Sequence, residues 1–599
     1  MLTKNPESAV TAVLDALGDA LGAGDIDRAV SLFSDECYWR DLLTFTWNLK
    51  TVEGAAEIRH MLESQLAATA PSGFALDPRY AVETDGDITK AFFTFDTPVA
   101  AGEGYIRLKN GKIYTLLTAM AALKGFEETV GARRPLGAKH GQGKQRPSWL
   151  EERQAEAESL GSQEQPYVVI IGGGQGGIAL GARLRQLGVS AIILEKNAKA
   201  GDSWRNRYKS LALHDPVWYD HLPYMDFPKN WPVFAPKDKM GDFLEMYTKI
   251  MELNYWTSST CQSASYDEAS KTWTVVVNRD GTEMVLKPSH LVFATGMSAK
   301  PNKPEFRGME RFKGEQHHSS GHPGPDRYAG KRVVIVGANN SAHDIAASLW
   351  EHDADVTMIQ RSPTHVVRSD TLMELGLGPL YSEEALEKGI TTHKADMIFA
   401  SWPYAIMHEH QKELHDRIRA HDKDFYDRLA ASGFQLHWGD DESGIQMLYV
   451  RRGSGYYIDI GASELIASGE IKVKPGDVEE ITEDGVMLTD GTYLAADLIV
   501  YATGYGSMNG FVADLVSPEM ADKVGKVWGL GSGTYKDPGP WEGEPRNMWK
   551  PTAQENLWFH GGNLHQSRHY SLFLALQLKA RQEGLDTPVY GVPPVHHTA

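Results

Sequence analysis

The segment YVVIIGGGQGGIALGARLRQLGVSAIILEK, residues 167–196, decides the fold. An apolar run leads into Gly172, Gly174 and Gly177 at GxGxxG spacing, an amphipathic stretch follows, and a second apolar run ends at Glu195. In a dinucleotide-binding βαβ unit the first glycine permits a tight turn, the second lets backbone N–H groups approach a pyrophosphate, and the third packs helix on strand. Glu195 is placed to accept hydrogen bonds from a ribose and disfavours a 2′-phosphate, so the segment predicts a site for FAD or NAD.

A second segment of the same kind is VVIVGANNSAHD, residues 333–344. Gly337 follows an apolar strand, and Asn339 takes the second glycine position, where we expect its tolerance of left-handed backbone angles to matter. Ala342 can replace the third glycine. The next strand leads to Arg361, and a guanidinium there suits a 2′-phosphate, so the second nucleotide is predicted to be NADPH.

Composition excludes several classes of protein. A chain of 599 residues is expected to form two to four domains, and its formal net charge of -19 argues against nucleic acid or an anionic membrane as the main partner. Only two cysteines, Cys37 and Cys261, are present, which disfavours a disulfide scaffold or a dithiol reductase. No apolar run approaches ~18 residues, so we expect a soluble cytoplasmic protein.

The pattern along the chain predicts an α/β fold with two dinucleotide-binding (Rossmann-like) domains behind a smaller α+β domain. In residues 1–125 helical patterns precede β-prone runs with turn pairs, an arrangement that resembles the NTF2-like (SnoaL-like) cone domains. Residues 126–165 are polar and predict a linker. We assign 166–300 and 495–599 to an FAD-binding domain. Residues 301–494 form the NADPH-binding domain, with an insertion at 370–460 that is expected to line the substrate site.

Further motifs resemble the class B flavin-containing monooxygenases, nearest to the YUCCA-like branch and related to the Baeyer–Villiger monooxygenases. AGDSWRNRYKSLALHDP, residues 200–216, is similar to the family's GGxW segment and the LHxP element that follows it. In FKGEQHHSSGH, residues 312–322, Phe312 and His318 match the FxGxxxHxxx(Y/F/W) motif, but His322 stands at the aromatic position. Two ATG triplets, at 294–296 and 502–504, look like the family's links between the FAD and NADPH domains.

The resemblance implies that NADPH reduces FAD, O2 adds to the flavin C4a, and the hydroperoxyflavin passes one oxygen atom to a small organic substrate. His214 occupies the place where many members put an Asn against the flavin. The catalytic candidates are His214, Asp215 and His318, and no metal is expected. The residues assigned to cofactor binding are Gly172, Gly174, Gln175, Gly177, Glu195, Lys196, Gly201, Ser203, Trp204, His214, Thr295, Gly296, Gly337, Asn339, Asn340, Ser341, Ala342, Arg361, Ser362, Thr503, Gly504, Tyr505 and Asn563.

The reaction type stays open at this point. Ala212 falls at the position of the arginine that is essential in the Baeyer–Villiger relatives, which favours N- or S-oxygenation or YUCCA-like oxidation of a 2-oxo acid over lactone formation. The alternatives are Baeyer–Villiger oxidation, an NADPH oxidase or reductase without oxygen transfer, and a non-catalytic nucleotide sensor. The N-terminal domain could bind a small hydrophobic molecule, cover the substrate entrance or hold a homodimer together.

Overall fold

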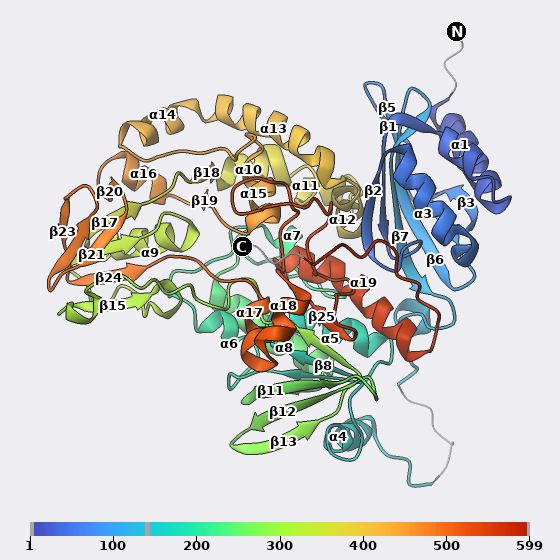
Figure 1. Ribbon diagram of the computed structural model, residues 1–599, viewed down its shortest axis with the longest axis horizontal. Coiled ribbons are helices and arrows are strands. Elements are labelled where there is room, and N and C mark those ends of the chain that lie inside the picture. The colour runs from blue at the N-terminus through green and yellow to red at the C-terminus, as the bar shows by residue number, and fades with distance from the viewer. Residues whose placement is uncertain (1–4, 138–143, 596–599) are drawn as a thin grey trace.

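The computed structural model describes residues 5–137 and 144–595, so residues 138–143 of the predicted linker lie outside the described chain. Three helices pack on a seven-stranded sheet at the N-terminal end, drawn in blue in Figure 1. The helices are α1 (Pro6–Gly22), α2 (Ile26–Ser31) and α3 (Gly54–Thr69). The strands are β1 (Phe33–Leu42), β2 (Leu49–Glu53), β3 (Ser72–Leu76), β4 (Glu83–Asp85), β5 (Ile88–Asp96), β6 (Ala100–Lys109) and β7 (Lys112–Leu123), in the order β2-β1-β7-β6-β5-β3 with β4 on β5.

Local chemistry explains the turns of this N-terminal domain. Asn110 and Gly111, between β6 and β7, both have positive φ, as a type I′ hairpin turn requires. The interior between helices and sheet is filled by aromatic rings, with Trp39, Phe45 and Phe95 each at most 2% exposed. These helices and strands make an α+β unit; its NTF2-like identity stays a prediction.

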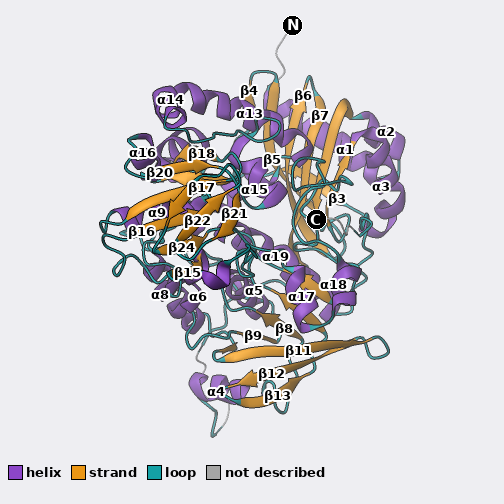
Figure 2. Ribbon diagram, turned by 60° about the vertical axis from the view of Figure 1, so that its left-hand side comes forward, coloured by secondary structure: helices purple, strands orange, loops and turns teal. Residues whose placement is uncertain are grey.

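The next part of the chain builds a five-stranded parallel sheet in the order β10-β9-β8-β14-β25. Its strands are β8 (Val168–Ile171), β9 (Ala191–Leu194), β10 (Tyr255–Trp256), β14 (His290–Phe293) and β25 (Leu557–Phe559). Its helices are α4 (Trp149–Ser159), α5 (Gln175–Gln186), α6 (Asp202–Arg205), α7 (Val217–Asp220), α8 (Lys237–Ile250) and α19 (Leu564–Gln582). Figure 2 shows β11 (Ser259–Asp267), β12 (Thr272–Arg279) and β13 (Thr282–Leu286) as a separate antiparallel layer below this sheet.

A second parallel sheet has the order β15-β24-β16-β17-β20. Its strands are β15 (Glu315–His318), β16 (Arg332–Val336), β17 (Asp355–Gln360), β20 (Lys472–Pro475) and β24 (Leu498–Tyr501), and α9 (Asn340–Trp350) follows β16. Residues 498–501, which the sequence assigned to the first dinucleotide unit, therefore complete the second, because β24 pairs with both β15 and β16.

The segment between β17 and β24 is mainly helical. It contains β18 (His365–Arg368), α10 (Ser369–Leu372), a π-turn (Met373–Leu377), α11 (Glu383–Glu387), α12 (Thr392–Ala400), α13 (Tyr404–His421), α14 (Lys423–Ala431), α15 (Gly444–Arg452), β19 (Tyr456–Asp459), α16 (Ala462–Ala467), β21 (Val478–Ile481), β22 (Gly485–Leu488) and β23 (Tyr493–Ala495). After β24 come α17 (Asn509–Leu515) and α18 (Pro518–Val524), and short 3-10 turns lie at Gly131–Arg133, Met309–Arg311 and Ser319–Gly321. Within the described chain, no helix has the length and apolar character needed to cross a membrane.

The N-terminal domain docks on the rest of the molecule through a buried ion pair. The Arg40 guanidinium donates to both carboxylate oxygens of Glu544, at 2.7 Å each, and both side chains are 1% exposed. Arg40 also donates to the carbonyl of Ala400 at the end of α12 and to the hydroxyl of Tyr570 on α19. One side chain therefore joins the N-terminal sheet to three distant segments.

Candidate functional site: two facing dinucleotide cradles

The first glycine turn is closed by the first ATG triplet. Gly172 has φ of +109°, and a Cβ there would lie 2.4 Å from the carbonyl oxygen of Ala294. A Cβ on Gly177 would lie 2.0 Å from the carbonyl oxygen of Gly172, so helix α5 can start against β8 only with glycine. Gly174 is the N-cap of α5. The free N–H groups in the first turn of this helix therefore point toward the glycine loop.

Glu195 lies where the sequence places it, one residue past the end of β9. It is buried, and its carboxylate accepts hydrogen bonds from the N–H groups of Gly173 (3.2 Å) and Asn197 (2.8 Å). Burial raises the pKa of Glu195, and these N–H groups oppose that shift. Nearby, the hydroxyls of Ser203 and Thr295 are buried without a partner in the described chain. A glycine turn at a helix N-terminus, a strand-end carboxylate and two unused hydroxyls fit FAD.

The other residues assigned to this cradle hold its walls. Gly201, the N-cap of α6, has φ of +87°, and a Cβ on it would lie 2.0 Å from the carbonyl oxygen of Gly241 on α8. The Trp204 indole donates to the Gln175 side chain at 3.2 Å. Gly296 has positive φ in an open turn, and Lys196 is exposed.

The second cradle repeats the arrangement of the first. Gly337 has φ of +127°, and a Cβ there would lie 2.3 Å from the carbonyl oxygen of Ala502 in the second ATG triplet. Ala342 is fully buried at the third glycine position. The expectation that Asn339 uses left-handed backbone angles is wrong. Its φ is -107°, close to the extended backbone of Gly174 in the first turn. A side chain is tolerated here because the position never needs left-handed angles.

Around the second turn, several side chains are engaged within the protein. The Asn340 amide oxygen accepts from the N–H of Ile458 at 3.1 Å, and Ser341 lies in the first turn of α9. The Thr503 hydroxyl donates to the carbonyl of Asn302. Arg361 and Ser362 are exposed directly after β17, and Arg361 forms no ion pair in the described part of the chain. A free guanidinium at this strand end fits the 2′-phosphate of NADPH.

His214 joins the two cradles. Its Nε2 lies 3.3 Å from the Asp344 carboxylate on α9, and the same carboxylate accepts from the Tyr208 hydroxyl at 2.7 Å. Burial lowers the pKa of His214 and the Asp344 carboxylate raises it, with a net upward shift. The His214 ring thus pairs with the second dinucleotide unit, and its position against the flavin stays a prediction.

Asp215, the next residue, has no hydrogen bond or ion pair among the described residues. Burial raises the pKa of Asp215 to about 6, while nearby His214 acts to lower it. Burial raises the pKa values of Tyr219, Tyr449 and Tyr456, and the nearby Asp215 charge raises them further, so the carboxyl faces an aromatic region. The buried carboxyl of Asp220 lies close enough for the Asp215 charge to raise its pKa further, after burial. Carboxyl groups with pKa values shifted in this way are typical of a functional site.

Asn563 contacts Tyr219 and Tyr449, and its side chain stabilises the local structure. Its amide oxygen caps α19 by accepting from the N–H of Gln566 at 2.9 Å, and its amide nitrogen donates to the Tyr219 hydroxyl at 3.2 Å. These hydrogen bonds engage the side chain within the protein, and the assignment of Asn563 to cofactor binding stays a prediction. The Asn563 N–H donates to the Tyr449 hydroxyl at 3.0 Å, which ties α19 to α15.

His318 also has both ring nitrogens in use. Nδ1 lies 2.9 Å from the Ser320 hydroxyl and Nε2 lies 3.2 Å from the carbonyl oxygen of Gly504. Its ring makes an edge contact with Tyr505, whose hydroxyl accepts from Arg207. The geometry describes an interdomain contact, and a catalytic role of His318 stays a prediction.

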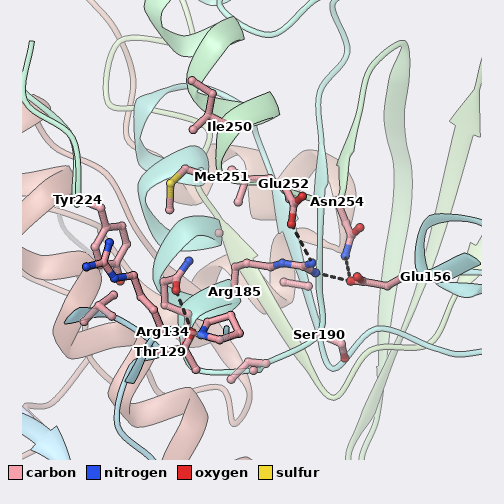
Figure 3. Close-up of a pocket in the computed structure, with 18 of the residues that line it drawn as sticks. Thr129, Arg134, Glu156, Arg185, Ser190, Tyr224, Ile250, Met251, Glu252 and Asn254 are labelled. Atoms are coloured by element: carbon pink, nitrogen blue, oxygen red, sulfur yellow. Dashed lines mark hydrogen bonds and ion pairs between the residues drawn. The ribbon is translucent and has the colours of Figure 1, made fainter. Parts of the chain in front are cut away.

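A groove of about 870 Å³ lies on another part of the FAD unit (Figure 3). It is bounded by the linker and by the C-terminal ends of α5 and α8, and Arg185 bridges Glu156 and Glu252 across it. None of the residues assigned to the cofactors lines it. The groove therefore does not contribute to the cradles.

Sequence reasoning missed Tyr219, Tyr449 and Tyr456, which come from α7, α15 and β19. The high Tyr, Trp and Met content of the insertion at 370–460 pointed only toward Tyr449 and Tyr456, and Tyr219 lies outside that insertion. It also missed Asp344, the partner of His214, because that contact spans 130 residues and has no local pattern.

Comparison with known proteins agrees with this geometry. Residues 169–442 match the family described as pyridine nucleotide-disulphide oxidoreductase. The chain is 32% identical over 343 residues to indole-3-pyruvate monooxygenase YUCCA1 of Oryza sativa subsp. japonica, covering 57% of this chain and 77% of that protein. It is 31% identical over 345 residues to the probable indole-3-pyruvate monooxygenase YUCCA3 of Arabidopsis thaliana, covering 57% and 73%. An ε-caprolactone-bound crystal structure of cyclohexanone monooxygenase aligns at TM-score 0.50 and 17% identity, covering 70% of this chain and 88% of that one.

Fold and site together define a flavoprotein oxidoreductase with one dinucleotide site for FAD and one for NADPH. The chain belongs to the class B flavin monooxygenases. The similarity to the two plant relatives covers 57% of the chain.

Proposed function

We propose that this enzyme uses NADPH and O2 to oxygenate a small organic substrate at nitrogen or sulfur. The observation that carries the proposal is the meeting of the two cradles at residues 208–215, where Tyr208 and His214 contact Asp344 of the second unit. This contact holds the two cofactor sites in register, which transfer of hydride between two bound cofactors requires. FAD, once bound and reduced, supplies the activation of O2.

Within this class of reaction, Asp215 favours an amine. A carboxylate among aromatic rings stabilises an ammonium group through charge and cation–π attraction. Because burial raises its pKa to about 6, the Asp215 carboxyl is a better acceptor for the ammonium proton than an ordinary aspartate. Taking up that proton frees the nitrogen lone pair for oxygenation.

A second candidate is oxidation of a 2-oxo acid, which the similarity to the YUCCA proteins favours. It is the weaker proposal, since the free carboxyl of Asp215 would repel an anionic substrate. Baeyer–Villiger oxidation lacks support from Ala212, which stands at the arginine position of that group.

The test compares, for the FAD-loaded enzyme, NADPH consumed, peroxide released and product oxygenated with an amine, a sulfide, a ketone and indole-3-pyruvate. We expect oxygenated product to match NADPH consumption most closely with the amine. Conversion of all NADPH to peroxide with every substrate class would instead identify an NADPH oxidase. Product only from indole-3-pyruvate, or only from the ketone, would move the assignment to the corresponding alternative.

A further inference from the structure

Four basic side chains beyond the end of β17 form no ion pair in the described part of the chain, although the charge of Asp440 acts on Arg452 and that of Asp537 acts on Lys526. They are Arg361, Arg452, Lys526 and Lys536, and none has a carboxylate within 4 Å in the described part of the chain, although the protein carries a net charge of -19. Arg452 and Lys536 both lie against the ring of Tyr535, with the guanidinium carbon 5.4 Å and the ammonium 5.5 Å from its centroid. The Lys526 ammonium donates to the carbonyl of Lys536 at 3.3 Å.

The positive charges of this cluster repel one another, and this repulsion affects the pKa of Lys536. Burial lowers the pKa of Lys536, and the charges of Arg361, Arg452 and Lys526 lower it further. Gathering like charges costs free energy, and an anion bound among them removes that cost. Asp440 and Asp537 offset part of this positive charge, and the excess of cations that is left suits a bound anion.

Two of these cations come from one loop, the strap, which we define as residues 525–546. Asp537, fully buried, fixes the strap by accepting from the N–H groups of Leu530, Gly531 and Ser532 at 2.9–3.0 Å. Its carboxylate also pairs with Arg546 at 3.2 Å. Lys536 is thus carried on a rigid loop.

The strap is also attached to the second dinucleotide unit. The N–H of Tyr535 donates to the Asp440 carboxylate at 2.6 Å, and Lys536 itself has φ of +63°, an uncommon backbone angle for a lysine. Backbone strain of this kind is often kept where a ligand is bound. Arg452, on the last turn of α15, has its Nε held by the carbonyl of Ser454, which fixes its guanidinium near the same place.

We propose that the strap supplies part of the 2′-phosphate site, with Lys536 and Arg452 binding this phosphate together with Arg361. The inference rests on the proposed use of NADPH by the second unit and names two residues that the βαβ pattern does not reveal. A phosphate dianion held by an ammonium and two guanidinium groups gains several charge-assisted hydrogen bonds, and NADH offers no group in their place. Selection of NADPH then depends on a segment that lies outside the second parallel sheet.

The test uses isothermal titration of the FAD-loaded, full-length protein with NADP⁺, NAD⁺, 2′,5′-ADP and 5′-AMP, which requires no turnover. Lys536→Ala and Arg452→Ala are compared with Lys388→Ala. In this control the lost lysine is exposed, lies in the same 370–460 insertion as Arg452 and pairs with Glu384. We expect each test variant to weaken NADP⁺ and 2′,5′-ADP about tenfold or more, since each removes a charge-assisted contact. NAD⁺ and 5′-AMP should change less than about twofold, and Lys536→Arg should restore most of the NADP⁺ affinity.

Unchanged NADP⁺ affinity in Lys536→Ala and Arg452→Ala would overturn the proposal, as would an equal loss of NADP⁺ and NAD⁺ affinity, which indicates a purely structural role. The flavin absorbance and thermal midpoint of each variant show whether it folds. Because binding is measured without substrate, a failure to oxygenate any amine or sulfide would contradict the proposed function and leave this result standing.

Discussion

At the scale of single residues, both cofactor turns share one feature. In each, a glycine lies against the backbone carbonyl of the alanine in an ATG triplet. We expect Gly172→Ala to abolish FAD binding, because its Cβ would lie 2.4 Å from the Ala294 oxygen at a φ of +109°. The measurement is the ratio of flavin to protein absorbance after purification with added FAD. Gly176→Ala is the control, since its Cβ would meet nothing closer than 3.4 Å. A yellow Gly172→Ala protein would show that the turn can relax.

A second prediction for a single residue concerns pH. The Asp344 carboxylate shifts the pKa of His214 upward in the folded protein, so the protonated ring stabilises the fold. This contribution is fully present below the unfolded histidine pKa, about 6.5, and is lost as pH rises through the higher folded value. We expect the thermal midpoint of the wild type to exceed that of His214→Gln more at pH 6 than at pH 9. An equal difference at both values would mean that the pair carries no charge.

Residue positions within a local motif could be predicted from the sequence, and their tertiary partners could not. The glycines, Glu195 and Arg361 follow from strand, turn and helix in register. The pairing of His214 with Asp344 depends on how two units pack, which no spacing encodes. Asn563 was assigned to cofactor binding from its motif, but the hydrogen bonds that occupy its side chain come from α7 and from its own helix.

At the scale of elements, the parallel strands and their helices follow the hydrophobic pattern, whereas the strap does not. The strap has no periodicity, and its Gly, Asp and Pro residues indicate only turns. Its conformation comes from the buried Asp537 carboxylate, an acceptor for residues five to seven positions earlier. The domain boundary predicted at residue 495 differs from the observed one for a related reason. Strand β24 belongs to the second sheet because it pairs with strands far away in the sequence.

The strap offers its own prediction. Asp537→Ala leaves three N–H groups and the Arg546 guanidinium without their acceptor, which costs about 1–3 kcal/mol for each buried group that water cannot reach. We expect faster proteolysis within residues 525–546 and weaker binding of NADP⁺, with FAD retained. The strap would be dispensable for NADP⁺ if its cleavage rate rose while the affinity stayed the same.

At the scale of the whole molecule, the N-terminal domain docks on the rest of the chain through Arg40, and buried aromatic rings occupy its interior. Asp41, the acid at the centre of this domain, accepts hydrogen bonds from the Thr118 hydroxyl and from the N–H and hydroxyl of Thr46, and burial raises its pKa to about 6. With Trp39 and Phe45 filling the remaining space, a structural use of the domain is favoured over binding of a small molecule. We predict that deletion of residues 1–125 lowers the thermal midpoint but leaves FAD bound. Loss of flavin from the truncated protein would contradict this.

The docking itself is best tested at Arg40. Arg40→Met leaves the Glu544 carboxylate buried without its partner, which is expected to cost roughly 3–5 kcal/mol. The control is Arg59→Met, which breaks the exposed pair with Asp27 and should cost about 0–1 kcal/mol. Because a chain of several domains need not unfold in one step, the measurement is the rate at which limited proteolysis releases the N-terminal domain, together with the thermal midpoint. If Arg40→Met releases the domain no faster than Arg59→Met, then the apolar contacts alone hold it, and the ion pair only selects its orientation.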